Sequence, residues 1–345
     1  MPKVSIIVSA YNAEKYIKET IESLINQTFH DIEIIIGNDA STDSTLDVLD
    51  TIKDTRVKII SRSQNKGSYY TLNECIESAT GDYIANIDSD DIAYPRRIEK
   101  QVAFMEENHR VSLCGSGCDI IYDNGKVKRN IDPFPSEKQK HLSMPFGNFC
   151  LPHSSFMMRG DVLRDNSVRY GEYLYAGDYK MQWDLLQYGI VAVIPEILIG
   201  YRVHRGQNTS SYKREMIWSE KDSILDYIMD EISVPEEIKR GMQIGTRRTI
   251  KNKAMLSEFL EAFDRYCQIT GLKEQDEIIG NKFCDYIIRN VLWFQEGTPR
   301  LLSSILSERF SLCPKGFAGI KFVAKCMVAK IDNYCSYNGV GRDGI

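Results

Sequence analysis

Residues 4–10 read VSIIVSA, a continuous run of β-branched and small residues close to the start of the chain. A run without polar alternation is typical of a strand that is buried on both faces of a parallel sheet. Segments of the same character follow at IEIIIGN (32–38), VKIIS (57–61) and DYIANI (82–87). The sequence therefore predicts a series of buried strands in its N-terminal part.

Segments with helical character separate these strands. Apolar residues recur at helical spacing within residues 13–27, and the segments 40–52 and 68–79 follow the second and third strands. Alternating strands and helices predict right-handed βαβ crossovers. The expected fold class is therefore α/β, a doubly wound and mostly parallel sheet with helices on both faces.

The pattern changes beyond Pro95. Asn124-Gly125 is a strong signal for a β-hairpin. The other elements expected here are helices over about 95–107 and 177–188 and strands over 154–159 and 191–203. From Tyr212 onward the chain is helical in period and rich in Lys, Glu and Arg. We therefore predict a boundary near residue 210, followed by a mainly helical C-terminal region, 211–345.

Composition limits the classes of function. The chain has 345 residues, of which 43% are hydrophobic and 26% charged, so it can bury a sizeable core. Its formal net charge of -5 argues against a nucleic-acid-binding protein, which would carry a basic excess. We therefore expect partners to bind at a defined site, with no nucleic acid among them.

The cysteines and the hydropathy bear on the cellular compartment. The nine cysteines form no CxxC pair, and although Cys114 and Cys118 have the spacing of half a zinc site, no second pair answers them. Buried thiols in a reducing cytoplasm are the expectation. The N-terminus lacks the features of a signal peptide, and no window approaches the roughly 18 apolar residues of a membrane span. These patterns predict a cytoplasmic protein, soluble or peripheral to the inner face of the membrane.

Polar residues follow each predicted N-terminal strand. In open α/β sheets ligands bind at the carboxyl ends of the strands. The segments that meet there are Ser9-Ala10-Tyr11-Asn12, Asn38-Asp39, Asn65-Lys66-Gly67 and Asp88-Ser89-Asp90-Asp91. No GxGxxG follows a predicted strand, since its one occurrence is at 339–344, and GxxxxGK[ST] is absent, which disfavours a dinucleotide enzyme or a P-loop ATPase.

Motifs in the first part of the chain carry a resemblance to a known family. They are PKVSIIVSAYN (2–12), IIIGNDASTD (34–43), GDYIANIDSDD (81–91) and GYRVHRGQNTS (200–210). Each is weak alone, but in this order they resemble family 2 glycosyltransferases, inverting enzymes of the GT-A fold. The resemblance implies that residues 1–210 form a nucleotide-sugar-binding catalytic domain. It also implies a nucleoside-diphosphate sugar as donor, with UDP sugars preferred, and a glycan or lipid-linked acceptor.

The acidic segment after the fourth strand calls for a positive partner, because like charges this close repel one another. A divalent ion that bridges the phosphates of a departing nucleoside diphosphate would neutralise both the carboxylates and the phosphates. Mn²⁺ and Mg²⁺ prefer carboxylate oxygens. By resemblance, Asp90 would be a metal ligand and Asp88 would hold the ribose or the metal. His204 would be a further metal or phosphate ligand, with a structural role as the alternative. Asp91 would tune the site or cap the next helix. The alternative is a simple turn and helix cap.

The resemblance also assigns the residues that bind the donor. They are Ser9, Ala10, Tyr11, Asn12, Asp39, Asn65, Gly67, Asp88 and Ser89. Ala10 and Tyr11 would pack on the base and Asp39 would bind the base or ribose, although an Asx turn with Asp43 or Ser44 as the helix cap is a compatible alternative. Leu72 departs from the family, which commonly has Arg there, so that either a diphosphate or base contact is missing or Lys66 replaces it.

A carboxylate near the acceptor is needed as general base. By resemblance this is Asp178, at the start of the helix over 177–188, where the helix dipole favours the charged form. The alternative role is a first-turn acid that only stabilises the helix. Gly177 departs from the family, which usually has Glu there. Asp184, on another face of this helix, is expected at the surface.

Basic residues near the site have less definite roles. Arg202 and Arg205 flank His204 and are candidates for phosphate contacts. His153 resembles an acceptor-side position, with a structural role as the alternative.

The C-terminal region carries one amphipathic pattern. Its apolar stripe consists of Ile320, Val323, Met327 and Ile331, with Lys321 and Lys325 on another face. Such a helix could lie on an anionic membrane that presents a lipid-linked acceptor. The alternative is packing against its own domain or against a second subunit in a homo-oligomer.

Three functions therefore remain. The first is a metal-dependent inverting glycosyltransferase that builds a polysaccharide or glycolipid. The second is a nucleotide-sugar-binding module without turnover, which the departures at Gly177 and Leu72 would suit. The third, a sugar-phosphate nucleotidyltransferase, is disfavoured because the Gly-rich N-terminal loop of that class is missing.

Overall fold

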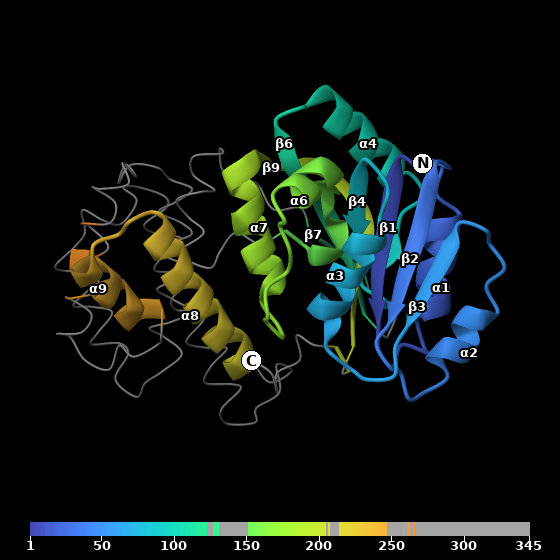
Figure 1. The fold of residues 1–345 in the computed structure, drawn as a ribbon, viewed down its shortest axis with the longest axis horizontal. Helices are drawn as coiled ribbons and strands as arrows, with labels where there is room; N and C mark the ends of the chain where they lie inside the picture. The colour runs from blue at the N-terminus through green and yellow to red at the C-terminus, as the bar shows by residue number, and fades with distance from the viewer. Residues whose placement is uncertain are drawn as a thin grey trace, which may run out of the picture. The chain divides into compact units, whose positions relative to one another are not determined.

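The computed structural model describes residues 1–122, 127–130, 151–204, 206–207 and 214–246, together with Glu258, Glu261, Ala262 and Arg265. The chain divides into two compact units, residues 1–137 with 150–220 and residues 138–149 with 221–345. The sheet belongs to the first of these units (Figure 1).

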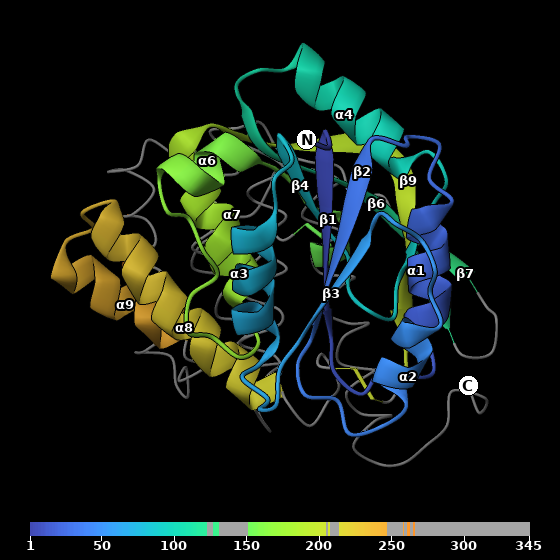
Figure 2. The same ribbon diagram turned by 45° about the vertical axis from the view of Figure 1, so that its right-hand side comes forward.

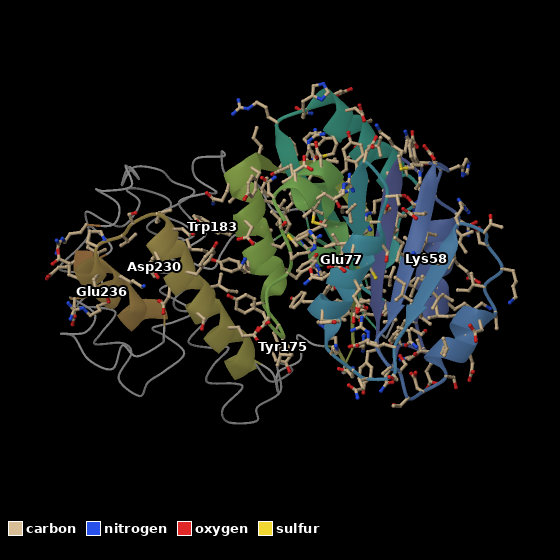
Figure 3. The ribbon with its side chains drawn as sticks, viewed as in Figure 1. Lys58, Glu77, Tyr175, Trp183, Asp230 and Glu236 are labelled. Carbon is tan, nitrogen blue, oxygen red and sulfur yellow. The ribbon has the colours of Figure 1, made fainter. Side chains whose placement is uncertain are left out.

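The first strands form the parallel half of the sheet. They are β1 (Val4–Ala10), β2 (Ile32–Asn38), β3 (Val57–Ser61) and β4 (Tyr83–Asn86), in the order β3-β2-β1-β4. Every pairing among them is parallel. The β-branched runs of the sequence therefore become buried parallel strands, as predicted. Lys58, labelled in Figure 3, is exposed on the edge strand β3, where a charged residue disfavours pairing with another chain.

The other half of the sheet is mixed. Its strands are β5 (Ile92–Ala93), β6 (Val111–Tyr122), β7 (Val127–Asn130), β8 (Met157–Arg159) and β9 (Ile190–Val203). The order continues β4-β8-β6-β9-β5, with β6 and β9 parallel and the others antiparallel. Strand β7 pairs antiparallel with β6, which confirms the predicted hairpin. Strand β9 therefore runs beside β5, which directly follows the acidic segment 88–91.

Helices cover both faces of this sheet. They are α1 (Ile17–Ile25), α2 (Thr45–Asp50), α3 (Ser68–Ser78), α4 (Arg97–Glu107), α6 (Gly160–Asp165) and α7 (Gly177–Tyr188). Figure 2 shows α3, α6 and α7 on one side of the sheet and α1 on the other. Ile17 and Ile21 of α1 are fully buried in one core cluster with Ile6 and Val8 of β1. Trp183 of α7, labelled in Figure 3, is also fully buried.

Two predicted elements differ in extent. The helix expected over 13–27 begins only at Ile17. The strand expected over 154–159 is shortened to β8, because His153–Ser155 form a 3-10 turn (η2) closed by the Ser155 N–H on the Pro152 carbonyl. This turn brings His153 and Ser154 beside the acidic segment.

The C-terminal prediction is tested only in part. Helices α8 (Arg214–Glu231) and α9 (Glu236–Thr246) confirm the helical character of the chain beyond Tyr212 as far as it is described. The apolar stripe over 320–331 lies outside the described residues. Among the described helices, none combines the length and the apolar composition that crossing a bilayer requires. Cys75, Cys114 and Cys118 are buried and lie outside any disulfide, as expected of structural thiols.

Candidate active site

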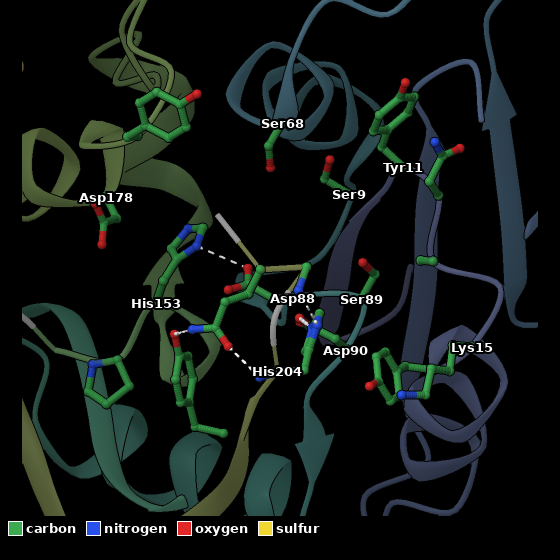
Figure 4. A pocket seen from close by; sticks show the side chains of 18 of the residues that line it. Ser9, Tyr11, Lys15, Ser68, Asp88, Ser89, Asp90, His153, Asp178 and His204 are labelled. Atoms are coloured by element: carbon green, nitrogen blue, oxygen red, sulfur yellow. Dashed lines mark hydrogen bonds and ion pairs between the residues drawn. The ribbon is translucent and has the colours of Figure 1, made fainter. Parts of the chain in front are cut away.

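A cavity of about 840 Å³ opens at the carboxyl ends of β1 and β4 (Figure 4). The end of β1 contributes Ser9, the loop after it contributes Tyr11 and Asn12, and the loop after β4 contributes Asp88, Ser89 and Asp90. Helix α7 and the end of β9 supply further walls. The cavity thus lies where the topology of an open α/β sheet predicts a ligand.

The cavity gathers most of the site residues expected from the sequence. On its wall lie Ser9, Tyr11, Asn12, Asp88, Ser89, Asp90, His153, Asp178 and His204. The remaining assignments, Ala10, Asp39, Asn65 and Gly67, are not part of that wall. Ala10 and Asp39 are at most 1% exposed. Arg205 lies outside the described residues.

Each carboxylate of the acidic segment has a different partner. Asp90 Oδ2 lies 2.8 Å from His204 Nε2, and Asp88 Oδ1 lies 3.1 Å from His153 Nδ1. Asp91 is 1% exposed and accepts hydrogen bonds from the Ser154 hydroxyl and the Arg202 backbone N–H. Asp91 therefore fastens β9 to the loop and does not cap the next helix.

The charges of this segment perturb one another. Burial and the neighbouring charge of Asp88 raise the pKa of Asp90. Burial, together with Asp88 and Asp90, raises the pKa of Asp91 well above its usual value. Burial alone would raise the pKa of Asp88 too, but the charge and hydrogen bond of His153 lower it. The loop therefore carries more negative charge than its histidine partners relieve.

The donor set at Asp90 suits a divalent cation. A carboxylate oxygen and an imidazole nitrogen face each other on the cavity wall, and both are ligands that Mn²⁺ accepts. In the part of the chain that the structure describes, no group of three or more His, Cys, Asp or Glu side chains is placed to hold a metal. Asp90 and His204 would therefore share an ion with phosphate or water oxygens.

Four cavity-lining residues of the loop after β1 were missed by the sequence analysis, and these are Ala13, Glu14, Lys15 and Tyr16. Lys15 and Tyr16 line the cavity, and the Tyr16 ring lies 4.8 Å from the ring of His204. The guanidinium of Arg202 lies over the Tyr16 ring, 4.7 Å from its centroid, and also donates a hydrogen bond to Glu19. The rule that located Tyr11 and Asn12 would have found all four residues if it had been extended to Tyr16, the residue before α1.

Asp39 organises the loop that precedes α3. Its Oδ1 accepts the Lys66 N–H at 2.9 Å and its Oδ2 accepts the Gly67 N–H at 2.8 Å. Gly67 has a φ of 94°, which favours glycine. The capping role at α2 belongs to Asp43, which accepts the Thr45 N–H at 3.0 Å.

The family departure at Leu72 has a structural reason. Leu72 is completely buried beneath α3, so position 72 faces the core and not the cavity. The Lys66 ammonium donates to the Tyr70 hydroxyl at 3.2 Å and lies over its ring. Lys66 is not part of the cavity wall.

Asp178 stands at the end of the cavity formed by α7. Its Oδ1 accepts the Tyr179 N–H at 2.8 Å and lies 3.4 Å from the Tyr69 hydroxyl. His153 approaches the same end, since its Nε2 lies 2.8 Å from the Tyr170 hydroxyl. The prediction for Asp184 was wrong, because its side chain is only 12% exposed in an ion pair with Lys180, which lies one helical turn earlier.

The chain is similar in sequence to known glycosyltransferases. The model of the family Glycosyl transferase family 2 matches residues 5–166. An uncharacterized glycosyltransferase of Haemophilus influenzae is 39% identical over 293 residues, which cover 79% of this chain and 89% of the relative. The Escherichia coli enzyme WfaP, a UDP-Glc:alpha-D-GlcNAc-diphosphoundecaprenol beta-1,3-glucosyltransferase, is 31% identical over 63% of this chain and 84% of its own.

A solved structure shares the fold. S. aureus TarS (residues 1–349), crystallised with UDP-GlcNAc, superposes with a TM-score of 0.55 at 18% identity, covering 84% of this chain and 89% of TarS. This likeness confirms the GT-A type of fold expected from the sequence.

Proposed function

Because this chain belongs to glycosyltransferase family 2, we propose that it is an inverting, metal-dependent enzyme that transfers a sugar from a UDP sugar to an acceptor hydroxyl. The acceptor is a glycan or a lipid-linked sugar. The observation that carries the proposal is the shared cavity, whose wall contains both the Asp90–His204 pair and Asp178.

The choice of donor and acceptor draws support from the relatives. WfaP is named for a UDP-glucose donor and a diphosphoundecaprenol-linked acceptor, and TarS was crystallised with UDP-GlcNAc. A cavity of about 840 Å³ is large enough for a nucleotide sugar. These similarities favour UDP over other nucleotides for this chain.

Asp90 and His204 would hold the ion. When bound, Mn²⁺ or Mg²⁺ supplies a Lewis acid that stabilises negative charge on the leaving diphosphate. Asp88 and Ser89 lie on the same cavity wall and would orient the ribose or phosphate groups. Tyr11 lines the same cavity and is 49% exposed, so its ring is accessible and would pack on the base.

Asp178 performs the proton transfer. The acceptor oxygen attacks the anomeric carbon from the face opposite the diphosphate, while the Asp178 carboxylate takes the hydroxyl proton. A new glycosidic bond forms as the anomeric bond to the diphosphate oxygen breaks, and UDP leaves with that electron pair. Attack from the opposite face inverts the configuration of the sugar.

We also propose that the protein is located in the cytoplasm. Buried thiols at Cys75, Cys114 and Cys118 favour the reducing cytoplasm. Contact with the inner membrane face, or with a second copy of the chain, would use the apolar stripe over 320–331.

A donor panel tests the function. We expect the melting temperature of the full chain to rise with UDP or one UDP sugar plus Mn²⁺, in a concentration-dependent way. With the stabilising donor, we expect the release of UDP, which Asp178→Asn abolishes while UDP still stabilises the variant. Binding of UDP without any release would identify a nucleotide-sugar-binding module. If no nucleotide stabilised the protein, the proposal would be wrong.

A further inference from the structure

The backbone of Gly177 lies directly against the aromatic ring of Tyr69. A Cβ atom at position 177 would come within 2.8 Å of Tyr69 Cδ2 and 2.9 Å of Cε2. The ring is 8% exposed and stacks on Tyr170 with 5.1 Å between the ring centroids. It therefore has little room to move aside. Tyr69 occupies the space that any side chain at position 177 would need.

The hydroxyl of Tyr69 points to the carboxyl group of Asp178. It lies 3.4 Å from Asp178 Oδ1, the same oxygen that accepts the Tyr179 N–H at 2.8 Å. Burial and the nearby charge of Asp178 raise the pKa of Tyr69 well above its usual value, so the phenol keeps its proton at neutral pH. A protonated hydroxyl can donate to a carboxylate, and two donors on one oxygen restrict the rotation of the carboxyl group.

The partner ring, Tyr170, is fixed in its turn. The Tyr170 hydroxyl lies 2.8 Å from His153 Nε2, and its backbone exchanges hydrogen bonds with the Asn73 side chain at 2.8 and 3.0 Å. Asn73 and Tyr69 belong to the same helix, α3. The Tyr69 ring is thus held between α3 and the segment before α7 rather than resting loosely in the cavity.

We propose that Tyr69 is the positioning residue for Asp178. Its ring takes the place of a side chain at position 177, and its hydroxyl holds the Asp178 carboxyl group where an acceptor hydroxyl can meet it. The inference rests on the proposed function, because only there does Asp178 act as a base. It assigns a role to the glycine at 177, which departs from the family pattern.

A structural role alone would not require the hydroxyl. The ring fills the space beside Gly177 and stacks on Tyr170, and phenylalanine would do both equally well. Tyr69 nevertheless lies on the wall of the cavity with its oxygen toward Asp178. The hydroxyl oxygen is therefore the part of the Tyr69 side chain that positions Asp178.

Tyr69→Phe tests the hydroxyl while keeping the ring. With the stabilising donor and its acceptor, we expect kcat to fall on the order of 10- to 100-fold, because a misplaced catalytic group costs rate. The KM for the donor, the melting temperature and the stabilisation by UDP should stay at their wild-type values. Tyr83→Phe is the matched control, since its hydroxyl binds Glu106 at 2.7 Å and the residue is not part of the cavity wall.

The outcomes separate this inference from the proposed function. A Tyr69→Phe enzyme with the wild-type kcat would overturn the inference and leave the function intact. Parallel losses of kcat, donor affinity and melting temperature would also overturn it, because they would indicate a structural role only. A wild-type protein that releases no nucleoside diphosphate from any donor would overturn both.

A packing experiment tests the role of the ring without an activity assay. We expect Gly177→Ala to lower the melting temperature, because the new Cβ meets the buried ring. The same substitution should lower it less in a Tyr69→Leu background, where the edge of the ring is gone. Equal effects in the two backgrounds, or a Gly177→Ala protein as stable as the wild type, would refute the assigned contact.

Discussion

The imidazole Nε2 of His204 lies 2.8 Å from Asp90 Oδ2, although the two residues are 114 positions apart in the chain. Strand β9 brings His204 to this place. The side chain of Arg202, near the end of that strand, donates to the Asp90 carbonyl at 2.8 Å, and the Arg202 backbone N–H donates to Asp91 at 2.7 Å. These two hydrogen bonds hold the end of β9 against the acidic loop, and they therefore fix His204 beside Asp90.

We expect transfer to require a divalent ion held by this pair. Treatment with a chelator should abolish UDP release and Mn²⁺ should restore it. Asp90→Asn should lower kcat on the order of 100-fold and raise the Mn²⁺ concentration needed for half-maximal rate, because it removes a charged ligand. A titration of the rate with Mn²⁺ measures both effects.

Asp82→Asn is the matched control for this experiment. Asp82 forms an exposed ion pair with Lys3 just before β4, and it is not part of the cavity wall. Its substitution should leave the Mn²⁺ titration unchanged. A chelated enzyme that kept its full rate would contradict the metal requirement.

Arg97 stabilises the base of the acidic loop. It is completely buried, and its Nη2 donates to the carbonyls of Asn86 at 2.7 Å and Phe156 at 3.2 Å. Burial lowers the pKa of Arg97 to about 10, so it is still charged at neutral pH. We expect Arg97→Met to lower the free energy of unfolding by about 1.5–3 kcal/mol or more, since charged hydrogen bonds to two buried carbonyls are lost.

The neighbouring residue provides a direct comparison. Arg96 is exposed and pairs with Glu99 on the surface of α4, and exposed ion pairs contribute little. Arg96→Met should change the free energy of unfolding by less than about 1 kcal/mol. Urea denaturation of both variants measures the contrast, and equal losses would show that the buried hydrogen bonds of Arg97 do not stabilise the base of the acidic loop.

The sequence predicts the parallel half of the sheet well, because its strands are apolar runs between clear helical segments. It predicts β8 poorly, since the turn at His153–Ser155 depends on contacts with the acidic loop far away in the chain. The rule that ligands bind at the ends of strands located the cavity, and the family resemblance supplied Asp178 and His204.

What the sequence could not predict are contacts between distant segments. The side chain that excludes any substituent at Gly177 is Tyr69, 108 positions earlier by residue number, and no local pattern links the two. The sequence likewise does not show that Leu72 lies on the buried face of α3, because that depends on how the helix packs on the sheet. Asp39 looked like a ligand in sequence, whereas the structure gives its oxygens to the backbone of Lys66 and Gly67.

Glu33 makes stability depend on pH. Its Oε1 accepts hydrogen bonds from the Ser5 hydroxyl at 2.6 Å and from the Thr80 N–H at 2.9 Å. Burial alone would raise the pKa of Glu33, but these hydrogen bonds lower it below the usual 4.5. The stabilisation is therefore complete above pH 4.5 and is lost as the pH falls through the lowered value in the folded state.

Glu33→Gln removes this contribution. We expect the variant to be less stable than the wild type at pH 7, and the difference to shrink as the pH falls below 4.5. Urea denaturation at several pH values measures it, with Glu107→Gln, at an exposed position, as control. A difference in free energy that stays constant with pH would contradict the role assigned to the Glu33 carboxylate.

The final prediction concerns Asp39 and the loop before α3. Its two oxygens each accept a backbone N–H, from Lys66 and Gly67. Asparagine has a single acceptor oxygen, so Asp39→Asn must turn an amide N–H toward one of these donors. We expect a loss of about 1–3 kcal/mol in the free energy of unfolding, the cost of leaving a buried donor unpaired.

Asp47→Asn, at an exposed position in α2, serves as the control and should change stability by less than about 0.5 kcal/mol. The same variants decide whether Asp39 also contacts the nucleotide, as the family resemblance implies. If Asp39 only holds the loop, UDP should raise the melting temperature of Asp39→Asn almost as much as that of the wild type. If Asp39 contacts the nucleotide directly, the rise should be smaller. Because Asp39 is 1% exposed and its oxygens already bind the backbone, we expect the first outcome. A wild-type free energy of unfolding in Asp39→Asn would show that these two hydrogen bonds do not hold the loop.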